Sequence, residues 1–162
     1  MLLINALGLS NGKHFIEISG KADGKVKSEF VENEIFVSGS LRVHNDRLIL
    51  KGIAKTDASL ICDLSLESFK DEIEAELNIN IIKGVKEEYP TEKDENTIYI
   101  GEEEKTADIT EIVLQELLVK LPMRKIAPQY RGKSVEDIYP QMKESKKEGQ
   151  SPFDILKNLK NN

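Results

Sequence analysis

The most constraining feature of this sequence is an alternation of apolar and polar residues between Phe69 and Ile81. Every second residue from Ile73 to Ile81 is apolar, and a glutamate or an asparagine stands between each pair. A period of two places the apolar side chains on one face of a β-strand, whereas a helix would scatter them around its surface. The DEIEAEL stretch favours helix by only tenths of a kcal/mol per residue, so the alternation outweighs propensity. We therefore predict a half-buried strand.

Further strands are predicted on both sides of this one. Glu34 to Val43 alternates in the same way, with Ile35, Val37, Gly39, Leu41 and Val43 on one side. Asn45 and Asp46 have turn-forming side chains, so Arg47 to Lys55 is predicted to return as the hairpin partner, with Leu48, Leu50, Gly52 and Ala54 inward. Thr56 to Leu64 continues that strand or begins another. Shorter strand candidates are Leu2 to Ala6, Lys13 to Ser19 and Thr97 to Ile100.

One segment, Asp108 to Leu121, shows helical spacing instead of alternation. Asp108 is the predicted N-cap, Glu111 completes a capping box, and Pro122 ends the helix because proline lacks a backbone donor. The apolar residues cover much of the helix circumference, which predicts burial against more than one neighbour. They are Ile109, Ile112, Val113, Leu114, Leu117, Leu118, Val119 and Leu121.

These elements predict an α+β fold in which the helix packs across an antiparallel sheet, either open or curled into a partial barrel. Residues 1–133 form the expected single domain, with the sheet built from residues 1–82 and extended by residues 97–100 if that strand joins it. An acidic loop occupies residues 83–105. Residues 134–162 form a helical tail, docked or mobile, with helix-like composition at Ser134 to Glu148 and a short amphipathic helix beginning near Ser151.

Composition excludes several classes of function. A chain of 162 residues with no secretory signal pattern and no membrane span is expected to be a cytoplasmic protein without a membrane partner. Cys62 is the only cysteine, and His14 and His44 have no ligand-like spacing, so we predict no metal site, no cofactor and no catalytic set. The acidic loop lacks the spacing of a calcium loop, and a solvated loop is the preferred interpretation. The protein is therefore expected not to be an enzyme.

The window from Leu117 to Val135 contains no acidic residue, although the formal net charge of the chain is −6. Its cations predict that the surface charge is locally positive and that this part of the chain can contact phosphate. The alternative is that they are ordinary surface charges without a ligand. Tyr130 lies among them and could stack on a base. The candidate RNA-binding residues are Lys120, Arg124, Lys125, Tyr130, Arg131 and Lys133.

At three places the residues resemble the YceD family, which is associated with accumulation of large-subunit ribosomal RNA. The segment from Leu60 to Leu66 is similar to a cysteine, two residues, cysteine, leucine motif, with Ser65 where the second cysteine is usual. Asp108 to Pro122 resembles the family's helix ending in leucine-proline, with Glu116 where a glutamate is usual. Tyr130 to Ser134 resembles a cysteine, lysine, glycine, leucine, cysteine loop without its thiols. The tail resembles the family's at Ser151-Pro152 but lacks its following arginine.

The resemblance implies a metal site in many members that this chain cannot hold. Ala127, Tyr130 and Ser134 stand where the family commonly carries cysteines. If a zinc ion normally ties the loop to the strand at Cys62, packing by Tyr130 or Met123 replaces it here, or the loop is flexible.

The resemblance also implies a non-enzymatic role in ribosome biogenesis, as a cytoplasmic, RNA-associated factor for accumulation of large-subunit ribosomal RNA or its precursor. The alternative is a protein-binding adaptor that recruits a ribosomal protein or a processing enzyme through the acidic loop and the terminal helix. RNA contact by so acidic a chain has to be local, through a few residues placed together.

Overall fold

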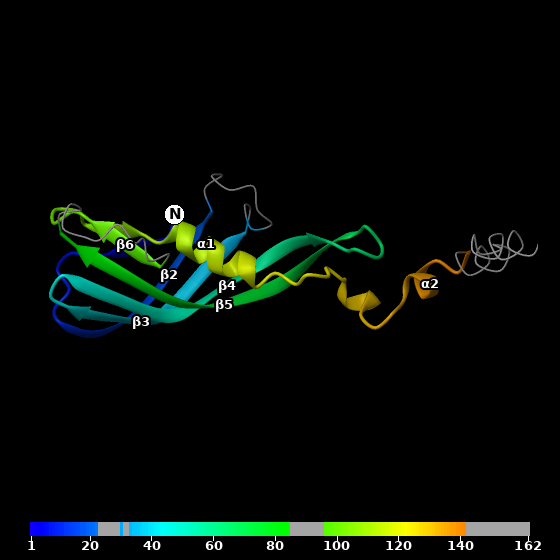
Figure 1. Ribbon diagram of the computed structural model, residues 1–162, viewed down its shortest axis with the longest axis horizontal. Coiled ribbons are helices and arrows are strands. Elements are labelled where there is room, and N and C mark those ends of the chain that lie inside the picture. Colours follow the sequence, from blue (N-terminus) through cyan, green and yellow to red (C-terminus); the bar gives the residue numbers. More distant parts are fainter. Residues whose placement is uncertain (23–29, 31–32, 85–95, 142–162) are drawn as a thin grey trace, which may run out of the picture. The chain divides into compact units, whose positions relative to one another are not determined.

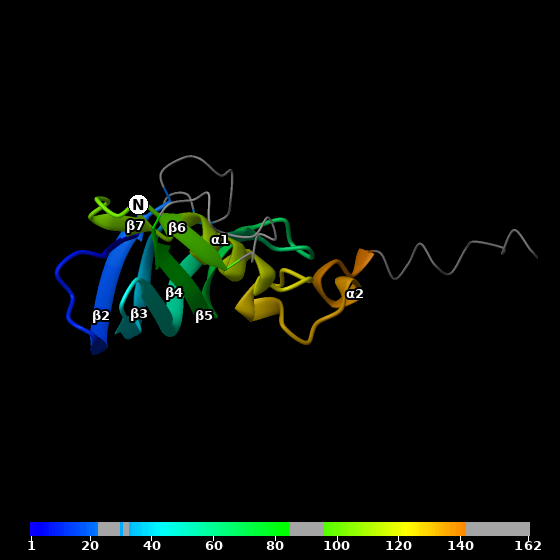
Figure 2. The same cartoon turned by 60° about the vertical axis from the view of Figure 1, so that its left-hand side comes forward.

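The computed structural model describes residues 1–22, 30, 33–84 and 96–141, and the chain forms two compact units (Figures 1 and 2). The first unit comprises Met1–Leu60 and Phe69–Met123, and the second comprises Ile61–Ser68 and Arg124–Asn162. The strands are β1 (Leu3–Asn5), β2 (Gly12–Lys21), β3 (Glu34–His44), β4 (Arg47–Ile61), β5 (Ser68–Lys83), β6 (Thr97–Ile100) and β7 (Thr106–Asp108). The helical elements are α1 (Thr110–Val119), the 3-10 turn η2 (Pro128–Tyr130) and α2 (Val135–Ile138).

The main sheet has five strands in the order β2-β3-β4-β5-β6. β2 and β3 pair antiparallel, as do β3 and β4, whereas β6 pairs parallel to β5, with Ile81 opposite Ile98. The prediction of a purely antiparallel sheet is therefore wrong at one edge, because a connection of 13 residues between β5 and β6 is long enough to bring the chain back in the same direction. The sheet is mixed and does not close on itself.

The alternation that predicted the long strands is also their burial pattern. In β5, Ile73, Ala75, Leu77, Ile79 and Ile81 are buried, while the glutamates between them are exposed. β3 buries Ile35, Val37, Leu41 and Val43, and β4 buries Leu48, Leu50 and Ala54 on the same side. The predicted strands at 69–81 and 97–100 are confirmed, and β4 continues through Thr56 to Ile61 as a single strand.

Gly39 and Gly52 lie directly opposite each other in the β3–β4 pair. A Cβ built on Gly39 would come 2.5 Å from the carbonyl oxygen of Lys51, and one built on Gly52 would come 2.3 Å from that of Ser38. The two backbones therefore approach more closely than any side chain would permit, so glycine is required at both positions.

A separate two-stranded sheet joins the N-terminus to the beginning of the helix. β1 pairs antiparallel to β7, with Ile4 opposite Ala107. The Leu2 N–H donates to the Thr110 hydroxyl oxygen over 2.7 Å, and the Ile109 N–H donates to the Leu2 carbonyl over 3.0 Å. The sequence prediction missed β7, because three residues beside an acidic stretch carry too little periodicity.

The predicted cap of the helix is wrong. Asp108 belongs to β7 and Ile109 occupies the N-cap position, without a side-chain cap hydrogen bond. The Asp108 carboxylate instead accepts the Thr110 N–H over 3.0 Å and the Thr110 hydroxyl. Asp108 pairs with Leu3 of β1 and is therefore extended. It lies one residue before the N-cap position, and its carboxylate accepts the N–H of Thr110, the first residue of the helix.

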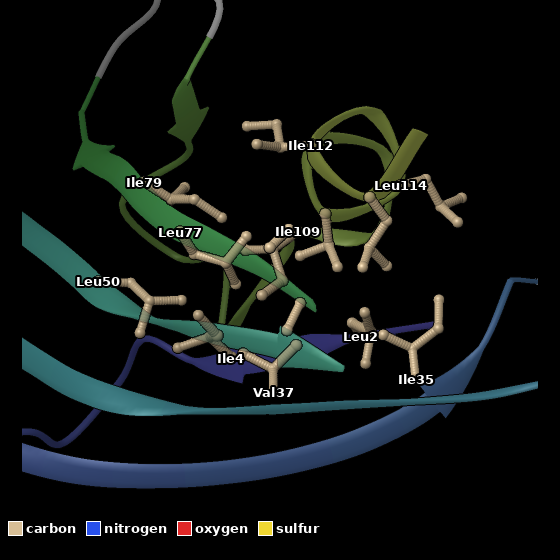
Figure 3. Close-up of a cluster of buried hydrophobic side chains, with 14 of the residues drawn as sticks. Leu2, Ile4, Ile35, Val37, Leu50, Leu77, Ile79, Ile109, Ile112 and Leu114 are labelled. Atoms are coloured by element: carbon tan, nitrogen blue, oxygen red, sulfur yellow. The ribbon is translucent and has the colours of Figure 1, made fainter. Parts of the chain in front are cut away.

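The core of the first unit lies between α1 and the main sheet. Figure 3 shows Ile109 and Leu114 together with Leu77 and Ile79 of β5, and side chains of β1, β3 and β4 fill the same space. Leu117 is also fully buried in this cluster. The expected packing of the helix across the sheet is thus confirmed, but Val119, predicted to extend the apolar face, is 79 % exposed. It belongs to the last turn of α1, where the helix leaves the core.

The acidic loop and the C-terminal tail are described only in part. Residues 85–95 and the predicted terminal helix near Ser151 lie outside the described residues. α2 ends at Ile138, before Pro140. Within the described part of the chain, no helix is long and apolar enough to cross a membrane.

Candidate functional site

The second unit begins with a tight turn between β4 and β5. The Cys62 N–H donates to the Glu67 carbonyl over 2.8 Å, and the Leu66 N–H donates back to the Cys62 carbonyl over 2.9 Å. Asp63 and Ser65 are turn-forming residues, and the Ser65 hydroxyl oxygen accepts the Glu67 N–H over 3.4 Å. Leu66 adopts the left-handed region with φ of 60°. The turn therefore has one defined shape, closed by backbone hydrogen bonds.

Four hydrogen bonds fix the loop that begins at Arg124 to this turn. The Asp63 N–H donates to the Lys125 carbonyl, and the Lys125 N–H donates to the Asp63 carboxylate, both over 2.7 Å. The Ala127 N–H donates to the Cys62 sulfur over 3.4 Å. The Tyr130 hydroxyl donates to the Glu67 carboxylate over 3.1 Å. We refer to residues 61–68 and 124–134, joined in this way, as the pinned loop.

Cys62 is the centre of the pinned loop. Its side chain is buried, as is Ala127, and the thiol is free. Burial alone would raise the pKa of this thiol, but hydrogen bonds from the Ala127 N–H, the Ser65 hydroxyl and the backbone of Ser65 and Leu64 lower it from 9.0 to about 7. Among the described residues, no three His, Cys, Asp or Glu side chains are grouped so as to hold a metal ion.

The second half of the pinned loop is held by its own short-range contacts. The Tyr130 N–H donates to the Ala127 carbonyl over 2.9 Å, and the Lys133 N–H donates to the Tyr130 carbonyl over 3.1 Å. The Lys133 ammonium lies 5.7 Å from the centre of the Tyr130 ring, within cation–π range. The hydrogen bond to Glu67, together with partial burial, raises the pKa of the Tyr130 hydroxyl. Beyond the loop, Ser134 and Asp137 form the capping box of α2.

The structure brings together five of the six predicted RNA-binding residues in the second unit. They are Arg124, Lys125, Tyr130, Arg131 and Lys133, while Lys120 belongs to the first unit as the C-cap of α1. The side chains of Arg124, Arg131 and Lys133 are exposed, and that of Lys125 is partly buried. Tyr130 is partly buried and its hydroxyl is engaged with Glu67, so its main observed contact is structural.

Two acidic residues of the pinned loop were missed by the sequence prediction. Asp63 and Glu67 are about 60 residues away in the sequence, yet both accept hydrogen bonds from the loop. Over residues 61–68 and 124–141, four basic side chains are matched by four acidic ones. No local pattern marks this pairing, since it depends on how two distant segments fold together. Asp63 and Glu67 come from another part of the chain, and Glu136 and Asp137 follow the basic window directly, so the predicted reversal of surface sign is cancelled over the described residues of this unit.

Residues 50–160 match the family model described as large ribosomal RNA subunit accumulation protein YceD. The chain belongs to the YceD family. No curated protein and no solved structure gives a match.

Three positions at which the YceD resemblance leads one to expect cysteine make contacts within the pinned loop. Ser65 and Ala127, two of the substituted positions, both donate hydrogen bonds to the Cys62 sulfur, and Tyr130, a third, bonds to Glu67. Of the two packing residues considered from the sequence, Tyr130 contacts the turn through Glu67. Met123 is wrong, because its side chain is fully exposed.

Proposed function

We propose that this member of the YceD family acts, without catalysing a reaction, in the accumulation of large-subunit ribosomal RNA by binding that RNA or its precursor directly. The family description supports the connection with large-subunit RNA. The observation that carries direct contact is the geometry of the pinned loop: four hydrogen bonds fix its backbone while Arg124, Arg131 and Lys133 remain exposed. Because the backbone is already fixed, binding to phosphate has to order only the side chains of these cations and not the loop itself.

The test is binding of purified full-length protein to large-subunit RNA fragments over a salt series. Arg124→Gln combined with Lys133→Gln should reduce the slope of log affinity against log salt by about 0.7 for each lost contact with single-stranded RNA. Lys70→Gln combined with Lys105→Gln removes the same charge from exposed positions outside the pinned loop and should leave the slope unchanged. An unaltered slope in a folded Arg124/Lys133 variant would remove this loop from the RNA contact.

The adaptor alternative is favoured by a different observation. Ile61 and Leu66, at the turn of the same unit, are 61 % and 79 % exposed, and a leucine with positive φ is strained. Exposed apolar side chains on a fixed turn suit a protein partner. If a ribosomal protein or processing enzyme copurifies after nuclease treatment, and Leu66→Ser abolishes that association, recruitment rather than RNA contact is the function.

A further inference from the structure

The outer face of the β2–β3–β4 sheet, turned away from α1, has an unusual composition. Because side chains alternate along a strand, the register defines which residues share this face. Ser19, Phe36 and Lys55 form one row across the three strands, and Phe15, Ser40 and Lys51 form another. Figures 1 and 2 show the three strands side by side, with α1 packed over the opposite face. We call this surface the outer sheet face.

Two phenylalanine rings stand exposed on the outer sheet face. Phe15 is 73 % exposed and Phe36 is 55 % exposed, so most of each ring is open to solvent. Their rows are four residues apart along β3, about 13 Å at the rise of an antiparallel strand. A shallow hollow beside Phe36 is lined by Glu17, Ser19 and Ser38 on the same face. Two open aromatic rings with neighbouring hydroxyl groups can each support a flat, partly polar group.

The outer sheet face is also the basic part of the sheet. Every Lys, Arg, Asp and Glu within Gly12–Lys21, Glu34–His44 and Arg47–Lys55 falls on it, and these comprise six basic and two acidic residues. Asp57, the next outward residue of β4, brings the net charge of the face to +3, in a chain whose formal net charge is −6. The exposed Glu72, Glu74 and Glu76 of β5 border this face at β4. The basic residues are Lys13, Lys21, Arg42, Arg47, Lys51 and Lys55.

The positions of individual cations on this face point to an anionic ligand. Lys13 lies directly opposite Arg42 in the β2–β3 pair, and like charges in opposite positions destabilise a sheet. The side chains of Lys13, Arg42 and Lys51 form no ion pair with any residue that the structure describes. Lys55 differs, because its ammonium lies 2.6 Å from the Glu74 carboxylate of β5. Three cations near two open rings are thus available to an external anion.

We infer that the outer sheet face binds a single-stranded segment of RNA, whose bases stack on Phe15 and Phe36 and whose phosphates contact Lys13, Arg42 and Lys51. The inference rests on the proposed RNA binding and adds to it a second surface and a preference for unpaired nucleotides. Aromatic rings on a sheet can stack only on bases that are free of a duplex, and stacking tolerates any sequence. In a duplex the bases are already stacked on one another, so only the phosphate contacts would remain.

The test uses full-length protein, a labelled mixed-sequence RNA of roughly 12 nucleotides, and the same RNA annealed to its complement. Wild-type protein is expected to bind the single strand more tightly than the duplex at about 0.15 M salt. Phe15→Leu combined with Phe36→Leu keeps two apolar side chains and removes both rings. This variant should bind the single strand about tenfold more weakly or worse, and bind the duplex as wild type does.

A charge variant provides the second measurement. Arg42→Gln combined with Lys51→Gln should reduce the salt slope by about 0.7 per lost contact, or about 1.4 in total. The matched control is again Lys70→Gln with Lys105→Gln, and circular dichroism establishes that each variant is folded. Ultraviolet crosslinking of the bound single strand should modify peptides that contain Phe15 or Phe36.

The outcomes separate this inference from the proposed function. If wild-type protein binds the RNA fragments but both outer-face variants bind as tightly as wild type, the outer sheet face is not a binding surface, and the proposed function stands on the pinned loop. Crosslinks confined to residues 124–134 would lead to the same conclusion. If wild-type protein binds neither RNA, direct binding is wrong, and the inference about this face is overturned with it.

Discussion

The outer sheet face and the pinned loop both present positive charge, but they differ in what surrounds it. The pinned loop contains the run that is most basic in the sequence, yet Asp63 and Glu67 fold against it and its unit is balanced in charge over the described residues. The cations of the outer sheet face are spread from Lys13 to Lys55, with apolar residues between them, and folding gathers them into a face of net charge +3. Charge along the sequence and charge on a surface are therefore different quantities whenever a strand alternates.

The two regions are also stabilised in different ways. The outer sheet face is the back of a sheet whose inner side chains pack against α1 in a large apolar cluster. In the second unit, the buried apolar side chains among the described residues are Cys62, Leu64 and Ala127, and its two segments are joined by hydrogen bonds. Stability of the first region should depend on packing, and that of the second on polar groups.

The largest expected effect tests the packing of the first region. Leu117→Ala should lower the free energy of unfolding by about 2 to 5 kcal/mol, because truncation of a fully buried leucine leaves a cavity. Val119→Ala, in the same helix but 79 % exposed, should change it by less than about 0.5 kcal/mol. Chemical denaturation of both variants measures the difference. Equal midpoints for the two would mean that α1 does not contribute to the core.

A smaller effect tests the polar contacts of the pinned loop. Asp63→Ala removes the acceptor of the Lys125 N–H but keeps the bond from the Asp63 N–H to the Lys125 carbonyl. The expected loss is about 1 kcal/mol, confined to this unit, because the carboxylate is exposed. Hydrogen exchange at the Lys125 amide should become about fivefold faster. Asp63→Asn keeps an acceptor and should show a smaller change.

Exchange at amides of the sheet serves as the internal control for this variant. Amides in β3 and β4 should exchange at their wild-type rates, because none of them bonds to Asp63. Acceleration throughout β3 and β4 would show that the pinned loop is not an independent source of stability, and the distinction drawn between the two regions would be lost.

The features that were predictable from the sequence are those that repeat. Alternation identified β3, β4 and β5 with their buried faces, because every second residue carries the same information. The helix was found for the same reason, although its cap was not, since Asp108 was already committed to pairing with Leu3 of β1. A single capping residue cannot reveal a strand pair formed with the other end of the chain.

Of the candidate site, only the basic residues could be predicted from the sequence. The fixed shape of the pinned loop depends on Asp63 and Glu67, whose acceptors meet Lys125 and Tyr130 only after folding. Phe15 and Phe36 stood on the polar side of their strands, where an aromatic residue departs from the pattern. That departure was a usable signal. Which residues surround the two rings could be known only from the strand register, which places Lys13 opposite Arg42 and Phe36 opposite Ser19.

The expected effect that is smallest at neutral pH concerns the thiol at the centre of the pinned loop. The pKa of Cys62 is lowered to about 7 in the folded protein from an ordinary value of 9.0, so the folded state releases its proton at a lower pH than the unfolded state does. Where the unfolded state binds more protons, stability rises with pH. The contribution of Cys62 is therefore fully present above pH 9.0, decreases as the pH falls, and is absent below pH 7.

Two variants measure this contribution. The difference in unfolding free energy between wild type and Cys62→Ala should grow as the pH rises from about 6 to about 10, and a difference that does not vary with pH would contradict the lowered pKa. Ala127→Pro tests the cause: Ala127 has φ of −59°, which proline can adopt, while proline lacks the N–H that donates to the sulfur. Ultraviolet absorbance of the thiolate should then titrate closer to 9.0 than in wild type. Titration at the wild-type pH in a folded Ala127→Pro variant would assign the shift to Ser65 instead, and would leave the Ala127 contact without an electrostatic role in holding the loop.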